Sequence, residues 1–311
     1  MRFEYGQGGI LDFKSEVNCN IFVETLWDDY SAVTIQNLKE SFNYKINESE
    51  EGEKSTVEIK NTQKQNQNQE FLKSIVEIPE NFNYDIETYG DIIHRKTFIS
   101  SKLYGDVRAI IKSVEGKFEG SKLACENIEI ETNQGDIKIS SLDVQNGKFR
   151  TKSGQIFAKR LGIPGKLEIE NQEGKINLES CYALYRHNKE SQISIRGENP
   201  AVNMGFTQGN VEIQLQKGKV FIRALDAAKL NIKAKQVRAN INQVLEDSLI
   251  EGEDIQLHFV ESIKNVNIRY QSENGDLIYF KGSSDSGYPT LEIRNIGENG
   301  TIVFQEQKID Y

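Results

Sequence analysis

Apolar and polar residues alternate along most of the chain. In residues 127–132, Ile128 and Ile130 fall on one side of an extended strand, while Glu129 and Glu131 fall on the other, because successive side chains of a strand point to opposite faces. This period of two recurs nearly everywhere, whereas the 3.6-residue period of an amphipathic helix is almost absent. The sequence therefore predicts an all-β fold whose strands each bury one face.

The alternating strands recur as units in which a strand, a turn and a second strand follow one another. Such units occupy residues 127–139, 148–156, 167–178, 210–220, 230–237, 266–277 and 291–302. The turn glycines Gly135, Gly154 and Gly174 are 19 and 20 residues apart, and Gly275 and Gly300 are 25 apart. We expect these glycines to supply the positive φ that a sharp turn needs.

A repeat of about 20–25 residues is typical of stacked coils, each of which buries its apolar face against its neighbours. An antiparallel β-sandwich with Asn-Gly and Gly-Asp hairpins is the alternative. We favour a β-solenoid, because apolar positions as well as turn residues follow the period.

The N-terminal third has a less regular pattern. Residues 41–46 and 55–60 flank an acidic turn and predict a hairpin, and residues 61–70 are rich in Gln and Asn. We expect residues 1–95 to form an N-terminal β portion or cap with a mobile polar loop at about 48–70. Residues 96–311 then form the solenoid repeats, and the whole chain is one continuous domain.

Two stretches carry a resemblance to a known family. Residues 76–88 hold a strand that ends at Pro79, and the pattern Ile-x-Ile-x-Thr-x-x-Gly-Asp-Ile then recurs, as in residues 128–137. Over roughly residues 71–302 the chain resembles the adhesin-like family of β-solenoid domains, which has bacterial and eukaryotic members of largely unassigned function. The resemblance implies a β-solenoid and no catalytic residues. It also allows a mitochondrial location, since some eukaryotic relatives are associated with mitochondria.

Composition narrows the class of protein. The chain has 311 residues, a net charge of −9 and three cysteines, too few for a disulfide scaffold. No stretch approaches the roughly 20 continuous apolar residues of a membrane span, and the opening residues lack a secretory signal. We therefore expect buried thiols and a reducing intracellular compartment, either cytoplasmic or mitochondrial.

One segment departs from the acidic average. Residues 217–238 contain seven cations and only Asp226 as an acid, a net charge of +6, which leaves −15 for the rest of the chain. The cations are Lys217, Lys219, Arg223, Lys229, Lys233, Lys235 and Arg238. If the coils stack, we expect Lys217, Lys219, Lys233 and Lys235 to share one wall. This basic patch is either an ordinary solvated surface or a docking surface for an acidic protein partner, with anionic lipid or RNA as lesser alternatives.

Candidate chemistry elsewhere is weak. Asp28 and Asp29 are adjacent and would not converge in a strand, and Cys181 and His187 lack an orienting third group. The three histidines, His94, His187 and His258, lack zinc spacing. His258 alternates with Leu257 and Phe259, so we expect it to point outward from a strand. Asp106, Asp136 and Asp276 follow turn glycines, but other repeats carry Gln155, Lys175, Asn210, Lys219 and Thr301 there, which argues against a calcium row. No nucleotide-binding motif occurs.

We therefore expect no catalytic, cofactor or metal site, no small-molecule ligand and no nucleic acid, which an acidic chain repels on average. The predicted function is a non-enzymatic structural or protein-interaction module, an accessory subunit or scaffold of a larger assembly. The alternative is a carbohydrate-binding or carbohydrate-active β-helix protein, which would show convergent acids or aromatic platforms along one groove.

Overall fold

The computed structural model describes part of the chain as backbone and a smaller part with side chains. The backbone is described for residues 2–3, 8–15, 19–26, 31–32, 34–36, 42–47, 54–61, 72–79, 82–88, 91–94, 98–99, 108–113, 116–183, 190–260, 267–271, 277–281, 287–296 and 302–307. Side chains are described for residues 11–14, 85–88, 91–93, 110–113, 116–183, 190–259, 267–271 and 287–296. These residues fall into two compact units, Met1–Phe157 and Ala158–Tyr311, which we describe separately.

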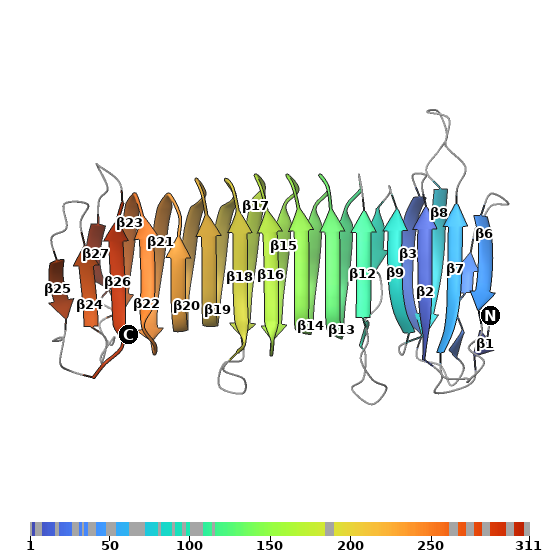
Figure 1. Cartoon of the computed structure of the whole chain (residues 1–311), viewed down its shortest axis with the longest axis horizontal. Coiled ribbons are helices and arrows are strands. Elements are labelled where there is room, and N and C mark those ends of the chain that lie inside the picture. Colours follow the sequence, from blue (N-terminus) through green and yellow to red (C-terminus); the bar gives the residue numbers. More distant parts are fainter. Residues whose placement is uncertain are drawn as a thin grey trace. The chain divides into compact units, whose positions relative to one another are not determined.

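Every regular element among the described residues is a β-strand (Figure 1). The first unit contains β1 (Arg2–Phe3), β2 (Gly8–Ser15), β3 (Cys19–Leu26), β4 (Ser31–Ala32), β5 (Thr34–Gln36), β6 (Phe42–Asn47), β7 (Lys54–Asn61), β8 (Leu72–Pro79), β9 (Phe82–Thr88), β10 (Ile92–His94), β11 (Phe98–Ile99), β12 (Arg108–Ser113), β13 (Phe118–Thr132) and β14 (Ile137–Thr151). The prediction of an all-β fold is confirmed.

The strand β15 (Ile156–Ile163) leads into the second unit. That unit continues with β16 (Lys166–Asn171), β17 (Lys175–Ala183), β18 (Gln192–Gly197), β19 (Ala201–Leu215), β20 (Lys219–Lys233), β21 (Gln236–Val244), β22 (Ser248–Gly252), β23 (Asp254–Val260), β24 (Asn267–Gln271), β25 (Leu277–Lys281), β26 (Thr290–Asn295) and β27 (Ile302–Gln307).

Each coil of the second unit passes through two parallel sheets. The first half of β19 pairs with β17 and its second half with β18, while the first half of β20 pairs with β21 and its second half with β22. We call the sheet of β17, β21, β23 and the first halves of β19 and β20 the rear wall. The sheet of β16, β18, β22, β26 and the second halves of β19 and β20 is the front wall (Figure 1).

The first unit follows the same plan. The first half of β13 pairs with β10 and its second half with β12, and both halves pair with β14. The offset between paired residues is 19 from Phe118 to Ile137, 18 from Ala201 to Lys219 and 26 from Lys175 to Ala201. Parallel pairing at these offsets confirms the solenoid, since a sandwich would pair consecutive strands antiparallel.

Buried apolar side chains lie in register from coil to coil. On the front wall, one row across six strands contains only isoleucine, and each of its members is at most 2% exposed. The row is Ile169, Ile195, Ile213, Ile232, Ile250 and Ile293. Fully burying one such side chain contributes about 1.5–3 kcal/mol. The polar neighbours in the alternate positions face outward, as the period of two predicts.

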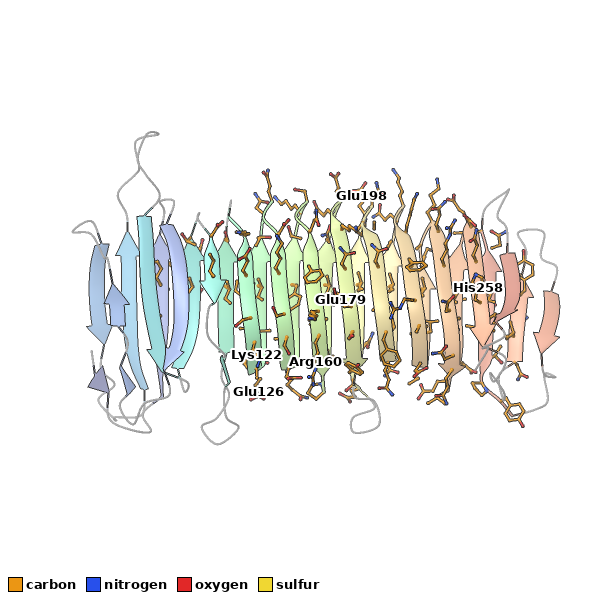
Figure 2. All side chains as sticks on the ribbon, turned by 180° about the vertical axis from the view of Figure 1, so that it is seen from behind. Lys122, Glu126, Arg160, Glu179, Glu198 and His258 are labelled. Atoms are coloured by element: carbon orange, nitrogen blue, oxygen red, sulfur yellow. The ribbon has the colours of Figure 1, made fainter. Side chains whose placement is uncertain are left out.

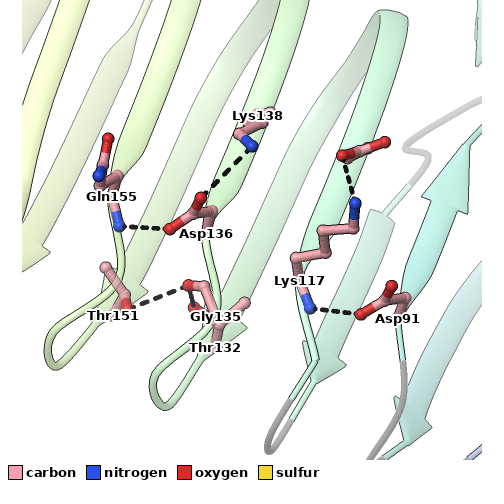
Figure 3. A network of polar contacts seen from close by, with 9 residues as sticks. Asp91, Lys117, Thr132, Gly135, Asp136, Lys138, Thr151 and Gln155 are labelled. Carbon is pink, nitrogen blue, oxygen red and sulfur yellow. Dashed lines mark hydrogen bonds and ion pairs between the residues drawn. The ribbon is translucent and has the colours of Figure 1, made fainter.

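The turns stack as closely as the strands. In the first unit, the Thr132 hydroxyl donates to the carbonyl oxygen of Gly135 at 2.6 Å (Figure 3). The next coil's Thr151 hydroxyl accepts from the Gly154 N–H at 3.0 Å. Thr132 and Thr151 are only 2% and 4% exposed. Each buried hydroxyl therefore finds its partner in the turn backbone, as buried polar groups require.

The turn glycines serve close packing rather than the positive φ that we expected. Neither Gly135 nor Gly154 has a positive φ. A Cβ at Gly135 would instead overlap the carbonyl oxygen of Gly116, and a Cβ at Gly154 would overlap that of Gly135. The expectation about φ was wrong, because the coil spacing leaves no room for a side chain at these positions.

Antiparallel pairs occur towards both ends of the chain. In the first unit β6 pairs with β7 and β5 with β8, and in the second unit β24 pairs with β25. The predicted hairpin of residues 41–46 and 55–60 matches β6 and β7. The strand β7 also occupies part of the expected polar loop, whose residues 48–53 and 62–70 lie outside the described ones. Parallel pairing already begins at β2, which pairs with β7 and β9.

Two cysteines belong to the core. Cys125 is 8% and Cys181 0% exposed, and both are free thiols. Burial raises the pKa of Cys125 to about 12 and the pKa of Cys181 further still, because the thiolate is disfavoured away from water. Both side chains are therefore protonated packing residues near neutral pH.

Replacing Gly135 or Gly154 by Ala should destabilise the fold by about 3 kcal/mol, because the added methyl group overlaps a backbone oxygen of the preceding coil. Urea unfolding followed by circular dichroism measures the change. Gly120→Ala is the control, because its Cβ would meet side-chain atoms, Leu123 Cδ1 at 2.9 Å and the Phe118 ring at 3.1 Å, rather than a backbone oxygen. Equal midpoints for all three variants would contradict close backbone packing as the reason for glycine.

Cys125 and Cys181 should resist iodoacetamide in the folded protein at pH 8, where a thiol with a raised pKa carries little thiolate. Both should become alkylated in denaturant. Peptide mapping by mass spectrometry reports each cysteine separately. Rapid modification of either site under native conditions would show that its coil opens or that its thiol is reactive.

Candidate interaction surface

The seven cations singled out in the sequence are all exposed, but they do not share one surface. Lys219 and Arg223 lie in the first half of β20, and Arg238 lies on β21, all on the rear wall. Lys233 ends the front-wall half of β20, and Lys229 lies near the bend between the two halves. Lys217 and Lys235 lie in the turns that precede β20 and β21.

The expectation that Lys219 and Lys233 share a wall was wrong, because Lys219 lies on the rear wall and Lys233 on the front wall. The strand β20 bends between its two halves, and its register with β19 shifts between Gly209 and Val211. Outward side chains on either side of the bend therefore face different ways. Lys217 and Lys235 do stack in neighbouring turns, since the Lys235 N–H donates to the carbonyl oxygen of Gly218.

Two of the seven cations are already paired with acids of the next coil. The Lys233 Nζ lies 2.5 Å from Glu251 Oε1, and the Lys235 Nζ lies 3.5 Å from Glu253 Oε2. The Lys235–Glu253 pair is exposed and adds little to stability, whereas Glu251 is largely buried beside the exposed Lys233. The two pairs neutralise both lysines locally, which makes Lys233 and Lys235 poor candidates for binding an acidic partner.

The rear-wall cations surround an exposed aromatic ring. Lys219, Phe221 and Arg223 alternate along β20 with the buried Val220 and Ile222. Arg238 lies directly opposite Phe221 on β21, in register. Phe221 is 46% exposed. We call Lys219, Phe221, Arg223 and Arg238 the rear-wall cluster.

No acid neighbours the cluster on either adjacent strand. On β19, Ala201 pairs with Lys219 and Asn203 with Phe221, and Gly205 lies beside Arg223. On β21, Gln236 pairs with Lys219, and the Asn240 amide donates to the Arg223 carbonyl oxygen at 2.8 Å. Among the described residues, Lys219, Arg223 and Arg238 form no ion pair. The cluster is therefore a local positive surface.

Acids return one strand further out. Glu179 on β17 and Asp254 on β23 lie two strands from the centre of the cluster. Figure 2 shows the rear wall with Glu179 and His258 on it, while Glu198 lies at its turn edge. His258 lies between the buried Leu257 and Phe259 on β23 and is partly exposed, so the prediction that it points outward is confirmed.

Phe221 is the residue that the sequence reading missed. The sequence does contain a sign of it. A large aromatic residue occupies an outward position of the alternating pattern, where polar residues are expected, between two cations. Of the four large apolar residues that are exposed in the described part of the chain, Phe221 alone lies within a strand. The others, Leu245, Tyr288 and Ile296, lie outside strands.

The remaining candidates do not assemble into a reactive site. Cys181 is fully buried, and His187 and Asp28–Asp29 lie outside the described residues, as does the His94 side chain. No group of three or more His, Cys, Asp or Glu side chains could hold a metal ion within the described part. That part also contains no helix that is long and apolar enough to cross a membrane.

The carboxylate of Asp136 binds a backbone N–H group of the next coil. Its Oδ1 accepts from the Gln155 N–H of the next coil at 2.9 Å, and its Oδ2 lies 3.4 Å from Lys138 Nζ (Figure 3). Asp91 accepts from the Lys117 N–H in the same way at 3.0 Å. Asp106 and Asp276 lie outside the described residues.

Comparison with known proteins supports this reading of the fold. A family model described as Toastrack DUF4097 matches residues 11–290, which is most of the chain. Comparison with curated proteins and with solved structures finds no match. The family is one of unknown function with a β-solenoid-like fold, and the match does not extend to the adhesin name. By this match the chain belongs to the Toastrack DUF4097 family.

Proposed function

We propose that the protein is a non-enzymatic interaction module that serves as an accessory subunit or scaffold in a larger assembly. The observation that carries this proposal is Phe221, a large apolar side chain held exposed near the start of β20 and bordered by Lys219, Arg223 and Arg238. Aromatic residues and arginine are enriched at the buried centres of protein–protein interfaces.

The stacking of coils makes the walls suitable for this role. Outward side chains of the second unit lie in rows about 4.8 Å apart across the strands, and buried apolar side chains such as Val220 and Ile222 hold the backbone beneath them. A partner would meet a surface whose backbone needs little reordering, which lowers the cost of binding. We place the protein in a reducing intracellular compartment, in keeping with the free, buried Cys125 and Cys181.

A carbohydrate-binding role is the second candidate, and it has an observation of its own. The amide side chains of Asn203, Gln236 and Asn240 lie on the strands beside Phe221. An exposed ring beside amide groups provides an apolar face with hydrogen-bonding partners, as sugars require. We rank it second, because three unpaired cations beside the ring favour an anionic partner over a neutral glycan.

Native isolation separates the two roles. The full chain, tagged in its own cells, should elute in a complex of constant stoichiometry with a protein partner, and added salt should weaken that complex. Gel filtration with mass spectrometry of the intact complex measures both. The isolated chain should not be retarded in native gels that contain neutral polysaccharides. Elution as a lone chain together with retardation by a polysaccharide would overturn the interaction proposal.

A further inference from the structure

We propose that the rear-wall cluster binds an acidic segment of a partner protein in extended conformation. An apolar side chain of that segment packs on Phe221, and carboxylates on either side of it pair with Lys219 and Arg223. Arg238 adds a third cation beside the ring. This inference rests on the proposed function and names the chemistry of the partner.

The spacing of the cluster favours an extended ligand. Three members of the cluster occupy every second position of one strand, at Lys219, Phe221 and Arg223. The Cα atoms of successive members are therefore about 6.6 Å apart. An extended peptide has the same repeat and places every second side chain on one face. A glutamate, an apolar residue and a second glutamate at alternate positions therefore lie over Lys219, Phe221 and Arg223 in turn.

Phe221 is fixed in an exposed position by the strand around it. Val220 and Ile222 are 2% and 0% exposed, so the alternation of β20 forces the Phe221 side chain outward. Its in-register neighbours are Asn203 and Arg238 rather than apolar residues that could cover it. The ring thus presents apolar surface that a partner can remove from water.

Charge selects an acidic partner for this position. Lys219, Arg223 and Arg238 have no ion-pair partner in the described part of the chain, whereas Lys233 and Lys235 are paired with Glu251 and Glu253. The chain as a whole carries −9, so an acidic segment is repelled by most of the surface and attracted here. The same net charge disfavours long polyanions such as RNA, which would extend beyond three cations.

Fluorescence anisotropy with defined peptides tests the inference on the full chain. The probe is a short labelled peptide in which glutamates lie two residues before and two residues after a leucine. The comparison peptide has the same composition with the glutamates next to each other. We expect the spaced peptide to bind at least about fivefold more tightly, and added salt to weaken its binding. Equal affinities for the two peptides would overturn the extended register.

Matched variants locate the site. The triple variant Lys219→Gln, Arg223→Gln and Arg238→Gln should weaken binding at least about tenfold, and so should Phe221→Ser alone. The control triple Arg160→Gln, Lys166→Gln and Lys229→Gln removes the same charge from exposed positions outside the cluster in the same unit. It should change the affinity less than twofold. Circular dichroism checks that all variants keep the fold.

Each contrary outcome has a distinct meaning. If both triple variants weaken binding equally, net charge and not the cluster holds the peptide, and the inference fails. Preferential binding of single-stranded RNA or of anionic phosphatidylserine vesicles over the spaced peptide would also overturn it. If the native complex survives in the cluster variants, the inference fails while the interaction role stands. A chain that is isolated alone and is retarded by a polysaccharide overturns the interaction role itself.

Discussion

In-register parallel stacking between coils is the constraint on which the rest of the structure depends. Each residue of a coil lies beside its counterpart in the next coil. The same residue type can therefore pack against its own kind at equivalent positions of successive coils. The row that runs from Ile169 to Ile293 shows the result on the front wall. Because each coil buries its apolar face only against its neighbours, the repeat must keep the same kind of residue at the same position.

The same constraint explains the turns. Coils whose backbones lie one strand spacing apart leave no room for a Cβ at Gly135 or Gly154. They also place polar groups of each turn within reach of their own turn or of the next one. Thr132 and Asp136 show both solutions, since the first bonds within its turn and the second accepts from the Gln155 N–H of the next coil. Turn residues that resembled a ligand row thus connect adjacent coils.

Stacking also determines which charges are available to a partner. A cation whose counterpart in the next coil is an acid is neutralised, as Lys233 is by Glu251. A cation whose counterparts are amides or small residues stays unpaired, as Lys219 does between Ala201 and Gln236. The basic segment of the sequence therefore separates into paired and unpaired members. The unpaired ones on the rear wall are grouped around Phe221.

The sequence alone determined the all-β class, the strand positions and the approximate period, because alternation and turn glycines are local signals. The outward face of His258 and the burial of Cys125 and Cys181 followed from the same alternation. Tertiary structure decided which residues of different coils become neighbours, which depends on the register and on the bend within β20. Lys219 and Lys233 belong to one basic run yet lie on different walls, whereas Phe221 and Arg238 meet across a coil, because neighbours in a solenoid are one coil apart in sequence.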